Sequence, residues 1–433
     1  MSAKMVKWAG VGRNRTIEVF FQRPAFDVKA EKVAAQVLRE IRRCGDAAVV
    51  RFVKKFDGVS LSASNLAVDK TILALARRKI SKNFVLAIKE AHRRIALFAE
   101  AGLRKDWQIA TPGGGAVGEK FVPMDRVGVY IPGGTAPLVS TALMTVTLAK
   151  TAGVKEIVAC SPCTDGNQIN NHLLYALDLA GATEVYRIGG IQAIGAMAYG
   201  TRSVRRVQKI VGPGGAFVTA AKRQVYGDVA LDLVAGPSEI AVLADDGAKP
   251  EYIAADLLSQ AEHGTGLEKS LLVTSSEKLA YAVRREIDKQ AQLLQRADAV
   301  NKVIADGMLL VVVRNVSDGM ALCNAFAPEH LELMVRHARK WVDKVRKAGA
   351  VFVGPWSPES VGDFVAGPSH VLPTGGAAAM FSGLTVDDFR RRTSVIACTK
   401  DDLKSVAPII DAFGLMEGLD GHAKSALMRF SQS

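Results

Sequence analysis

Cysteine, aromatic residues and long hydrophobic runs are all scarce in this chain of 433 residues. The five cysteines are an odd number and too few for a disulfide framework in so long a chain, which favours a reducing compartment. The first residues, MSAKMVKWAG, lack the apolar core of a secretory signal, and no apolar run approaches the ~20 residues that span a bilayer. We therefore expect a cytoplasmic protein that makes no membrane contact.

The low aromatic content also affects how the net charge of +13 is interpreted, because a basic protein can bind nucleic acid. Lysine and arginine occur in short dispersed runs without interleaved aromatic residues, so the platforms on which nucleic-acid bases stack are missing. We expect no nucleic-acid partner, and a positive surface that attracts anionic small molecules. The apolar share of 49% indicates a folded protein, and the length calls for two or more domains.

Short apolar segments that end in glycine alternate with helical segments from about residue 124 onwards. Strands are predicted over 127–131, 156–160, 184–188 and 207–211, and a second block follows from 240 to about 380 with strands near 240–243, 270–274 and 309–313. This alternation is typical of parallel βαβ units, whose glycine turns let a ligand approach the backbone. Because none of these predicted strands is followed by the G-x-G-x-x-G fingerprint, the pattern indicates a variant nucleotide fold.

The flanking segments have other patterns. Residues 27 to about 105 are predicted to be helical, with Phe84, Ile88, Ile95 and Phe98 on one face. The last fifty residues are predicted to form a strand and one or two helices as an appendage.

The segment Leu257-Leu-Ser-Gln-Ala-Glu-His-Gly264 contains the strongest local signal for a metal. Gln260 and His263 are three residues apart, so on a helix they share a face where an amide oxygen and an imidazole can bind one cation. Such ligands suit Zn²⁺. On this pair alone, a structural role is equally compatible with the spacing.

A carboxylate and an imidazole are adjacent in Ala327-Pro-Glu-His-Leu-Glu332. Glu329 and His330 are expected on a loop or first helical turn, where they could transfer protons at neutral pH. The alternative is an exposed helix N-terminus at which the acidic residue favours the helix dipole.

Three further constellations remain open at this point. Asp363, in a glycine-rich segment, could complete a Gln/His site, while His370 more simply hydrogen-bonds its own loop. Glu417 and His422 flank two glycines in a segment expected to be a loop that reaches into a site, and His422 could come from a dimer partner. Cys160-x-x-Cys163 has no second pair to complete a zinc site and is interpreted as structural.

In this order, these segments resemble those of the histidinol dehydrogenase family. The resemblance runs from about residue 25 to the end, through VGVYIPGGTAPL, GGIQAIGAMAYGT, VGPGGAFVTAAKRQV, DLVAGPSE, LLSQAEHG, APEHLEL, GDFVAGPSHVLPTGG and EGLDGHAKSALMR. It implies an NAD-dependent oxidation of histidinol to histidine through an aldehyde, with two NAD⁺ per turnover and one Zn²⁺ per subunit.

The resemblance also implies roles for particular residues. Gln260, His263 and Asp363 match zinc ligands, together with His422, which that family takes from the other subunit of a homodimer. Glu329 matches the proton acceptor and His330 its catalytic neighbour. The positions that match substrate contacts are Ser238, Gln260, His263, His330, Asp363, Glu417 and His422. The positions that match nucleotide contacts are Tyr130, Gln192 and Gly215.

The fold implied by the resemblance is α/β, with two incomplete Rossmann-like domains (aldehyde-dehydrogenase-like) and small N- and C-terminal dimerisation appendages. The expected division is an appendage over 1–24, a discontinuous first domain over 25–126 and 239–380, a nucleotide-side domain over 127–238, and an appendage over 381–433.

The sequence departs from the family pattern at three places. Gly215 and Ser369 stand where Asn is usual, and Ala377-Ala378-Ala379 stands where an Arg is common. These departures keep a second hypothesis open, a related zinc/NAD dehydrogenase that acts on another polar alcohol such as a sulfonated diol. A third, a non-catalytic binding protein that kept the fold, is disfavoured by the complete set of catalytic residue types.

Overall fold

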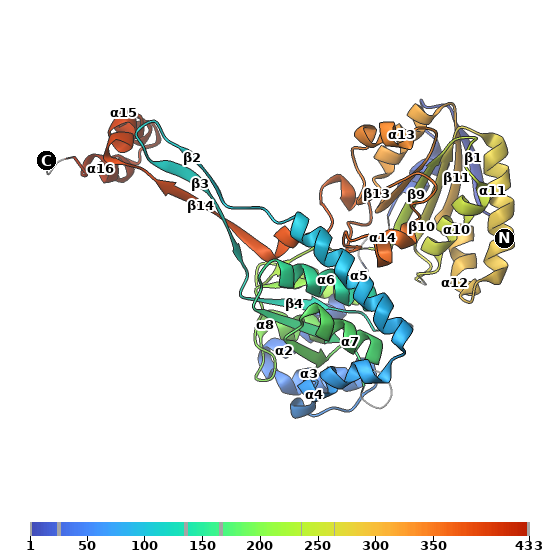
Figure 1. Cartoon of the computed structure of the whole chain (residues 1–433), viewed down its shortest axis with the longest axis horizontal. Helices are drawn as coiled ribbons and strands as arrows, with labels where there is room; N and C mark the ends of the chain where they lie inside the picture. The colour runs from blue at the N-terminus through green and yellow to red at the C-terminus, as the bar shows by residue number, and fades with distance from the viewer. Residues whose placement is uncertain are drawn as a thin grey trace.

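The computed structural model describes residues 2–23, 27–133, 137–163, 168–234, 236–263 and 265–430. These residues form two α/β domains, side by side, and a long arm that projects away from both (Figure 1). None of the described helices combines the length and the apolar content needed to cross a membrane.

The first domain is built on a six-stranded parallel sheet in the order β1-β11-β10-β9-β12-β13. One apolar core covers each face of the sheet, since buried strand residues alternate between the two faces. The strands are β1 (Lys4–Trp8), β9 (Glu239–Ala244), β10 (Lys269–Thr274), β11 (Met308–Val313), β12 (His330–Met334) and β13 (Ala350–Val353). Its helices are α1 (Arg15–Phe21), α10 (Pro250–Ala261), α11 (Glu277–Gln290), α12 (Ala297–Lys302), α13 (Val316–Phe326) and α14 (Glu359–Phe364).

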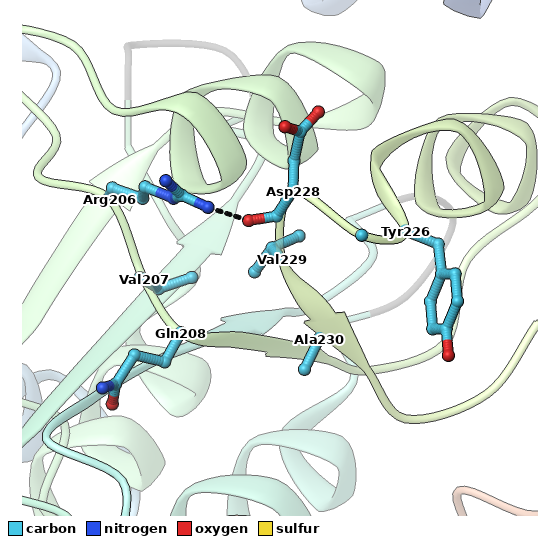
Figure 2. Close-up of a pocket in the computed structure, with 8 residues that line it drawn as sticks. Arg206, Val207, Gln208, Tyr226, Asp228, Val229 and Ala230 are labelled. Atoms are coloured by element: carbon cyan, nitrogen blue, oxygen red, sulfur yellow. Dashed lines mark hydrogen bonds between the residues drawn. The ribbon is translucent and has the colours of Figure 1, made fainter. Parts of the chain in front are cut away.

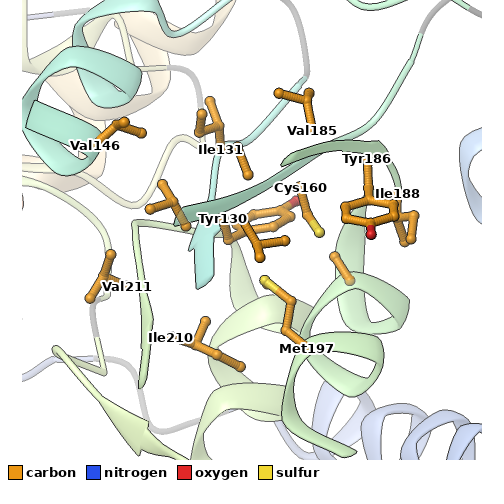
Figure 3. Packing of buried hydrophobic residues seen from close by; sticks show 14 of the residues in the cluster. Tyr130, Ile131, Val146, Cys160, Val185, Tyr186, Ile188, Met197, Ile210 and Val211 are labelled. Carbon is orange, nitrogen blue, oxygen red and sulfur yellow. The ribbon is translucent and has the colours of Figure 1, made fainter. Parts of the chain in front are cut away.

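The second domain is built on a five-stranded parallel sheet in the order β6-β5-β4-β7-β8. Its core packs tightly around Tyr130, Ile131 and Met197 (Figure 3), and a Cβ on Gly128 would lie only 2.5 Å from Met197 Sδ. The strands are β4 (Arg126–Tyr130), β5 (Glu156–Ser161), β6 (Glu184–Arg187), β7 (Lys209–Val211) and β8 (Ala230–Leu231). Its helices are α2 (Val28–Cys44), α3 (Asp46–Phe52), α4 (Lys70–Leu75), α5 (Lys82–Ala101), α6 (Val139–Thr151), α7 (Asn171–Ala180), α8 (Gly190–Tyr199) and α9 (Ala216–Val225).

The arm combines a three-stranded antiparallel sheet with two terminal helices. Its elements are β2 (Trp107–Ala110), β3 (Ala116–Pro123), β14 (Arg390–Ala397), α15 (Lys400–Glu417) and α16 (Asp420–Leu427). Asp402, in the first turn of α15, accepts hydrogen bonds from the backbone N–H groups of Gly113 (2.7 Å) and Gly115 (3.0 Å) and from the Thr111 hydroxyl (2.7 Å). This carboxylate therefore attaches the helical tip of the arm to the β2–β3 hairpin.

The α/β class with two parallel sheets is confirmed, and so are the helical segment before residue 105 and the C-terminal strand and helices. Cys160 and Cys163 are buried, as a structural role requires.

The structure corrects three expected boundaries. Helices α2 to α5 pack mainly in the core of the second domain, because their apolar faces meet α6, α7, α8 and α9. The end of α5 also approaches the range 239–380, at Gly367. The segment expected to be an N-terminal appendage supplies edge strand β1 and helix α1 to the first domain. The arm is assembled from 107–123 as well as from residues after 389.

The buried face of α5 also differs from the expected one. Val85, Ile88, Ile95 and Ala99 are buried, whereas Phe84 and Phe98 are 56% and 51% exposed. The buried face of α5 is therefore rotated by about one residue relative to the face that carries the large side chains of Phe84 and Phe98.

Candidate active site

Glu329 and His330 lie at the amino end of β12, which runs between β9 and edge strand β13 in the first domain. Glu329 lies in the bend before the strand, as the expected loop allows, and its carbonyl accepts from the Ala350 N–H (2.8 Å). His330 is the first residue of β12 and pairs with Ala350, so the expectation of a loop or helical turn was wrong for His330. Ala327 takes a left-handed conformation (φ 50°) and, with Pro328, separates α13 from the strand. Both catalytic candidates are buried.

The hydrogen bonds of His330 define which of its ring nitrogens can react. Nδ1 lies 3.2 Å from the Glu239 carbonyl oxygen and 3.1 Å from Gln260 Oε1. A backbone carbonyl only accepts, so Nδ1 carries the proton and Nε2 bears the free lone pair. Nε2 is buried and, among the described residues, has no hydrogen-bond partner. Burial lowers the pKa of His330 to about 3, so the ring is neutral at neutral pH.

Glu329 is surrounded by donors that fix its carboxylate. Its Oε2 accepts from the Glu239 N–H at 3.0 Å, and the Ser238 hydroxyl is a second donor. Burial, reinforced by the negative charge of Asp363, raises the pKa of Glu329 well above its usual value. Such a carboxylate is a stronger proton acceptor than one in water.

Side chains suited to a divalent cation gather beside this pair. The ligating atoms of His263, Glu359 and Asp363 all lie within 4.8 Å of one another, and Asp363 Oδ1 lies 3.7 Å from His330 Nε2. Gln260, the last but one residue of α10, has its Oε1 3.1 Å from His330 Nδ1, whereas His263 follows the helix and is exposed. Gln260 and His263 are therefore brought to one site, but not by sharing a helix face.

The cluster fits a cation because its acidic groups are not neutralised within the part of the chain that is described. Both carboxylate oxygens of Glu359 and the Gln260 Nε2 are buried without a hydrogen-bond partner there. Burial and neighbouring carboxylates raise the pKa of Glu359 well above its usual value, and burial raises the pKa of Asp363 to about 6. Buried carboxyl groups in this state require either protons or a bound cation.

Glu359 belongs to this cluster although no sequence pattern indicated a site role for it. Pro358 and Glu359 begin α14, a position where a carboxylate is usual for its interaction with the helix dipole. Nothing local distinguishes it from such a residue. The packing of α14 against α10, together with the bond from the Glu359 N–H to Glu332 Oε1 on β12 (2.9 Å), places it 3.5 Å from His330 Nδ1.

His370 has the loop role expected for it. Its Nδ1 lies 3.0 Å from the Asp363 carbonyl oxygen, and its Nε2 lies 3.0 Å from the Thr141 hydroxyl on α6. It therefore supports the backbone of the metal candidate Asp363 and links it to the second domain.

The nucleotide candidates lie at the carboxyl ends of the second sheet. The Tyr130 hydroxyl accepts from the Gly190 N–H at 3.1 Å, and Gln192 donates from Nε2 to Asp57 (3.1 Å). Asp57, also missed from the sequence, accepts from the Gly189 N–H at 3.0 Å and has its pKa raised by burial. Parallel α/β sheets bind nucleotides at such an edge, where helix N-termini converge.

Gly215 is the N-cap of α9 at this edge. Its φ of −70° suits any residue, and no atom lies within 4 Å of the place where its Cβ would be. A Cβ added at Gly215 would therefore meet no other segment of the described chain, and the backbone conformation there does not require glycine.

The structure does not bring Glu417 and His422 to the other candidates. Glu417 ends α15 and His422 lies in α16, not in the expected loop, and both are exposed. Figure 1 shows these helices at the far end of the arm, remote from α10, α14 and β12 of the same chain.

The comparisons with known proteins give the family. The family model for histidinol dehydrogenase matches residues 22–430. The chain belongs to the histidinol dehydrogenase family. It is 42% identical over 402 residues to a histidinol dehydrogenase of Moorella thermoacetica, covering 92% of this chain and 95% of the relative. A histidinol dehydrogenase of Heliobacterium mobile is 42% identical over 406 residues, covering 94% of this chain and 95% of that one.

A solved member of the histidinol dehydrogenase family has the same fold along the whole chain. The crystal structure of histidinol dehydrogenase from Elizabethkingia anophelis matches with a TM-score of 0.94 at 33% identity, covering 99% of this chain and 98% of that chain.

A cavity of about 580 Å³ lies away from these sites. Arg206, Gln208, Tyr226 and Asp228 line it, and Arg206 donates to the Asp228 carbonyl (Figure 2). These residues precede β7 and β8, so the cavity opens at the amino edge of the second sheet, opposite the nucleotide candidates. It contains none of the site residues expected for the histidinol dehydrogenase family.

Proposed function

We propose that this member of the histidinol dehydrogenase family oxidises L-histidinol to L-histidine through the aldehyde, as a step of histidine biosynthesis. The observation that carries the proposal is the buried Glu329–His330 pair, with one free imidazole nitrogen directed at a cluster of metal-binding side chains. A neutral base, a carboxylate and a cation site within a few ångströms are what sequential oxidation of an alcohol and a hydrated aldehyde requires.

His330 takes the hydroxyl proton in the first oxidation. Its Nδ1–H bond to the Glu239 carbonyl holds the ring so that the Nε2 lone pair faces the substrate. The imidazolium that forms is stabilised by Asp363, at 3.7 Å from Nε2, and by Glu329, at 3.9 Å from Nδ1.

Glu329 takes a proton from the water that adds to the aldehyde. Its carboxylate is oriented by the Ser238 hydroxyl and the Glu239 N–H, and its raised pKa strengthens it as a base. Burial of both groups keeps bulk water from the reacting carbon, so the aldehyde is held between the two oxidations.

The residues that would hold zinc are Gln260, His263, Asp363 and the partner subunit's His422. When bound, zinc would anchor the amino and imidazole nitrogens of the substrate. Ser238 and Glu417 would contact the substrate as well. Tyr130, Gln192 and Gly215 would hold NAD⁺, which accepts a hydride in each oxidation when it is bound there.

The arm supports the proposal of a homodimer with shared active sites. Its β14 and α15 expose apolar side chains that nothing in the described chain covers, among them Ile396, Phe413, Leu415 and Met416. His422 lies on α16, which Figure 1 shows at the far end of the arm, away from the first domain of the same chain.

A cytoplasmic location is likewise proposed, since all five cysteines are free.

An assay of NADH formation with zinc-loaded protein tests the activity. We expect histidinol to yield histidine, identified by mass, with two NADH per substrate. Absence of histidinol turnover, together with turnover of another polar alcohol such as a sulfonated diol, would contradict the proposal. The departures at Gly215 and Ser369 would then mark a changed specificity.

A Glu329→Gln variant separates the two oxidations. It keeps the shape but removes the base, so oxidation of added histidinaldehyde should fall about 10²- to 10⁴-fold, and oxidation of histidinol to the aldehyde should fall much less. The exposed Glu251→Gln variant on α10 is the matched control and should keep both rates. Equal loss of both steps in Glu329→Gln would contradict the role assigned to Glu329.

A further inference from the structure

Arg23 follows α1 and precedes the second domain, and its guanidinium makes hydrogen bonds to three different residues. Its Nε and Nη2 donate to the two carboxylate oxygens of Glu239 at 2.8 and 3.3 Å. Nη1 donates to the Phe21 carbonyl (2.8 Å), Nη2 also donates to the Phe326 carbonyl (2.6 Å), and the guanidinium lies 4.3 Å from the Phe326 ring centre. Arg23 thus joins the N-terminal segment to the end of α13, which immediately precedes the catalytic pair.

Glu239, the partner of Arg23, touches both catalytic residues through its backbone. Its N–H donates to Glu329 Oε2 at 3.0 Å, and its carbonyl oxygen lies 3.2 Å from His330 Nδ1. The carboxylate of the same residue is only 1% exposed and also lies 3.4 Å from the Gly376 N–H. A shift of this one residue would therefore alter the orientation of Glu329 and the protonation pattern of His330 together.

We propose that Arg23 and Glu239 are positioning residues, whose ion pair holds the Glu239 backbone so that His330 carries its proton on Nδ1 and Glu329 faces the substrate. The kinetic part of this inference rests on the proposed function; the statement about the His330 tautomer does not.

The geometry shows why arginine is needed at this position. The Glu239 carboxylate is too deeply buried to be hydrated. Removal of the guanidinium leaves it the Gly376 N–H and the nearby charge of Lys269 but, among the described residues, no ion-pair partner in hydrogen-bond contact, so the start of β9 must move to solvate it. Lysine restores the charge but not the two parallel hydrogen bonds, nor the bond to the Phe326 carbonyl at the same time. We therefore expect Arg23→Lys to be intermediate between wild type and Arg23→Gln.

The kinetic experiment compares zinc-loaded wild type with Arg23→Gln and Arg23→Lys. In Arg23→Gln, kcat for histidinol should fall about 10- to 100-fold while KM changes less than about threefold, because the base is misplaced and not removed. The matched control is Arg126→Gln. Arg126 pairs with Glu156 and Glu184 and is more deeply buried than Arg23 (7% against 17% exposed), but it lies at the amino edge of the second sheet. Its kcat should stay within about twofold of wild type.

A second experiment reads the tautomer directly. In ¹⁵N-histidine-labelled holoenzyme, the His330 signal is identified among the seven histidines by its loss in His330→Asn. Wild type should show a protonated Nδ1 and an unprotonated Nε2, and Arg23→Gln should show a mixture of tautomers. If Arg23→Gln does not fold, Glu239→Gln, which keeps the side-chain shape, replaces it with the same readouts.

The inference is overturned if Arg23→Gln keeps kcat within twofold of wild type, if its His330 tautomer is unchanged, or if Arg126→Gln loses as much kcat. If wild type does not oxidise histidinol, the proposed function fails, and the tautomer measurement still decides the inference about Arg23.

Discussion

Two inactive variants should restore each other's activity if His422 acts in the active site of another subunit. In the structure, His330 lies in the first domain and His422 lies on α16 at the tip of the arm. A His330→Asn subunit lacks the catalytic imidazole of the first domain but keeps His422 on its arm. A His422→Asn subunit keeps His330 in its first domain but lacks the histidine on its arm. A mixed dimer then contains one site with both histidines and one site with neither.

The magnitude of the recovery follows from counting sites. Random pairing of equal amounts of the two subunits gives about one half mixed dimers, each with one intact site of two, so the mixture should have about a quarter of wild-type activity. Each variant alone should retain less than about 1%, because every one of its sites lacks a proton acceptor or a zinc ligand.

The assay uses the two variants with different affinity tags, produced in the same cells and compared with each variant produced alone. Purification through both tags isolates the mixed dimers, whose activity should rise to about half that of wild type, with zinc bound at about one site per dimer. A double variant with both substitutions, paired with wild type, is the control for subunit exchange.

Absence of any recovery in doubly tagged dimers would refute the reasoning. It would mean that His422 acts within its own chain, or that it does not act in the site. Substantial zinc and activity in His422→Asn alone would refute the ligand assignment itself.

Three further predictions concern single residues. Gly215→Asn should lower the KM for NAD⁺ and add a few tenths of a kcal/mol to stability as a better N-cap of α9, measured by steady-state kinetics and melting; a raised KM would contradict the open space seen at Gly215. Because burial raises the pKa of Asp363 to about 6 in the metal-free chain, a cation must displace its proton below that pH. Zinc affinity, measured against a chelator, should therefore fall by at least about tenfold per pH unit below 6, since the histidine ligands must be unprotonated as well, and a flat profile would exclude Asp363 as a ligand. Asp402→Ala should make the α15–α16 tip sensitive to limited proteolysis while the two domains stay resistant, since Asp402 joins the tip to the hairpin.

Much of the second domain could be predicted because its signals are local. Each apolar segment, such as 127–131 or 184–188, closes on a glycine turn and is followed by a helix, and the structure has β4, β6 and α8 there. The family motifs likewise predicted that one site contains Gln260, His263, Asp363 and the Glu329–His330 pair. In the structure these residues lie close to one another.

The errors arise where distant segments decide the outcome. The apolar stripe of α2 predicts that one face of the helix is buried, but it does not indicate which of the two sheets covers that face. Pro328 before Glu329 suggests a helix start, and only pairing with β9 and β13 makes His330 the first residue of a strand. Glu359 has the sequence context of an ordinary helix N-terminus and becomes a site residue through tertiary packing alone.

Edge strand β1 has a consequence for the synthesis of the protein. Its partner is β11, with Lys4 opposite Leu309, and the second domain is encoded between the two. At a translation rate of 5–20 residues per second, β1 leaves the ribosome roughly 15–60 s before the strand it pairs with. During that interval it is an unpaired apolar strand of the kind that aggregates. Lys4 and Lys7, both exposed in the finished sheet, place two positive charges within its five residues and oppose pairing with another nascent chain.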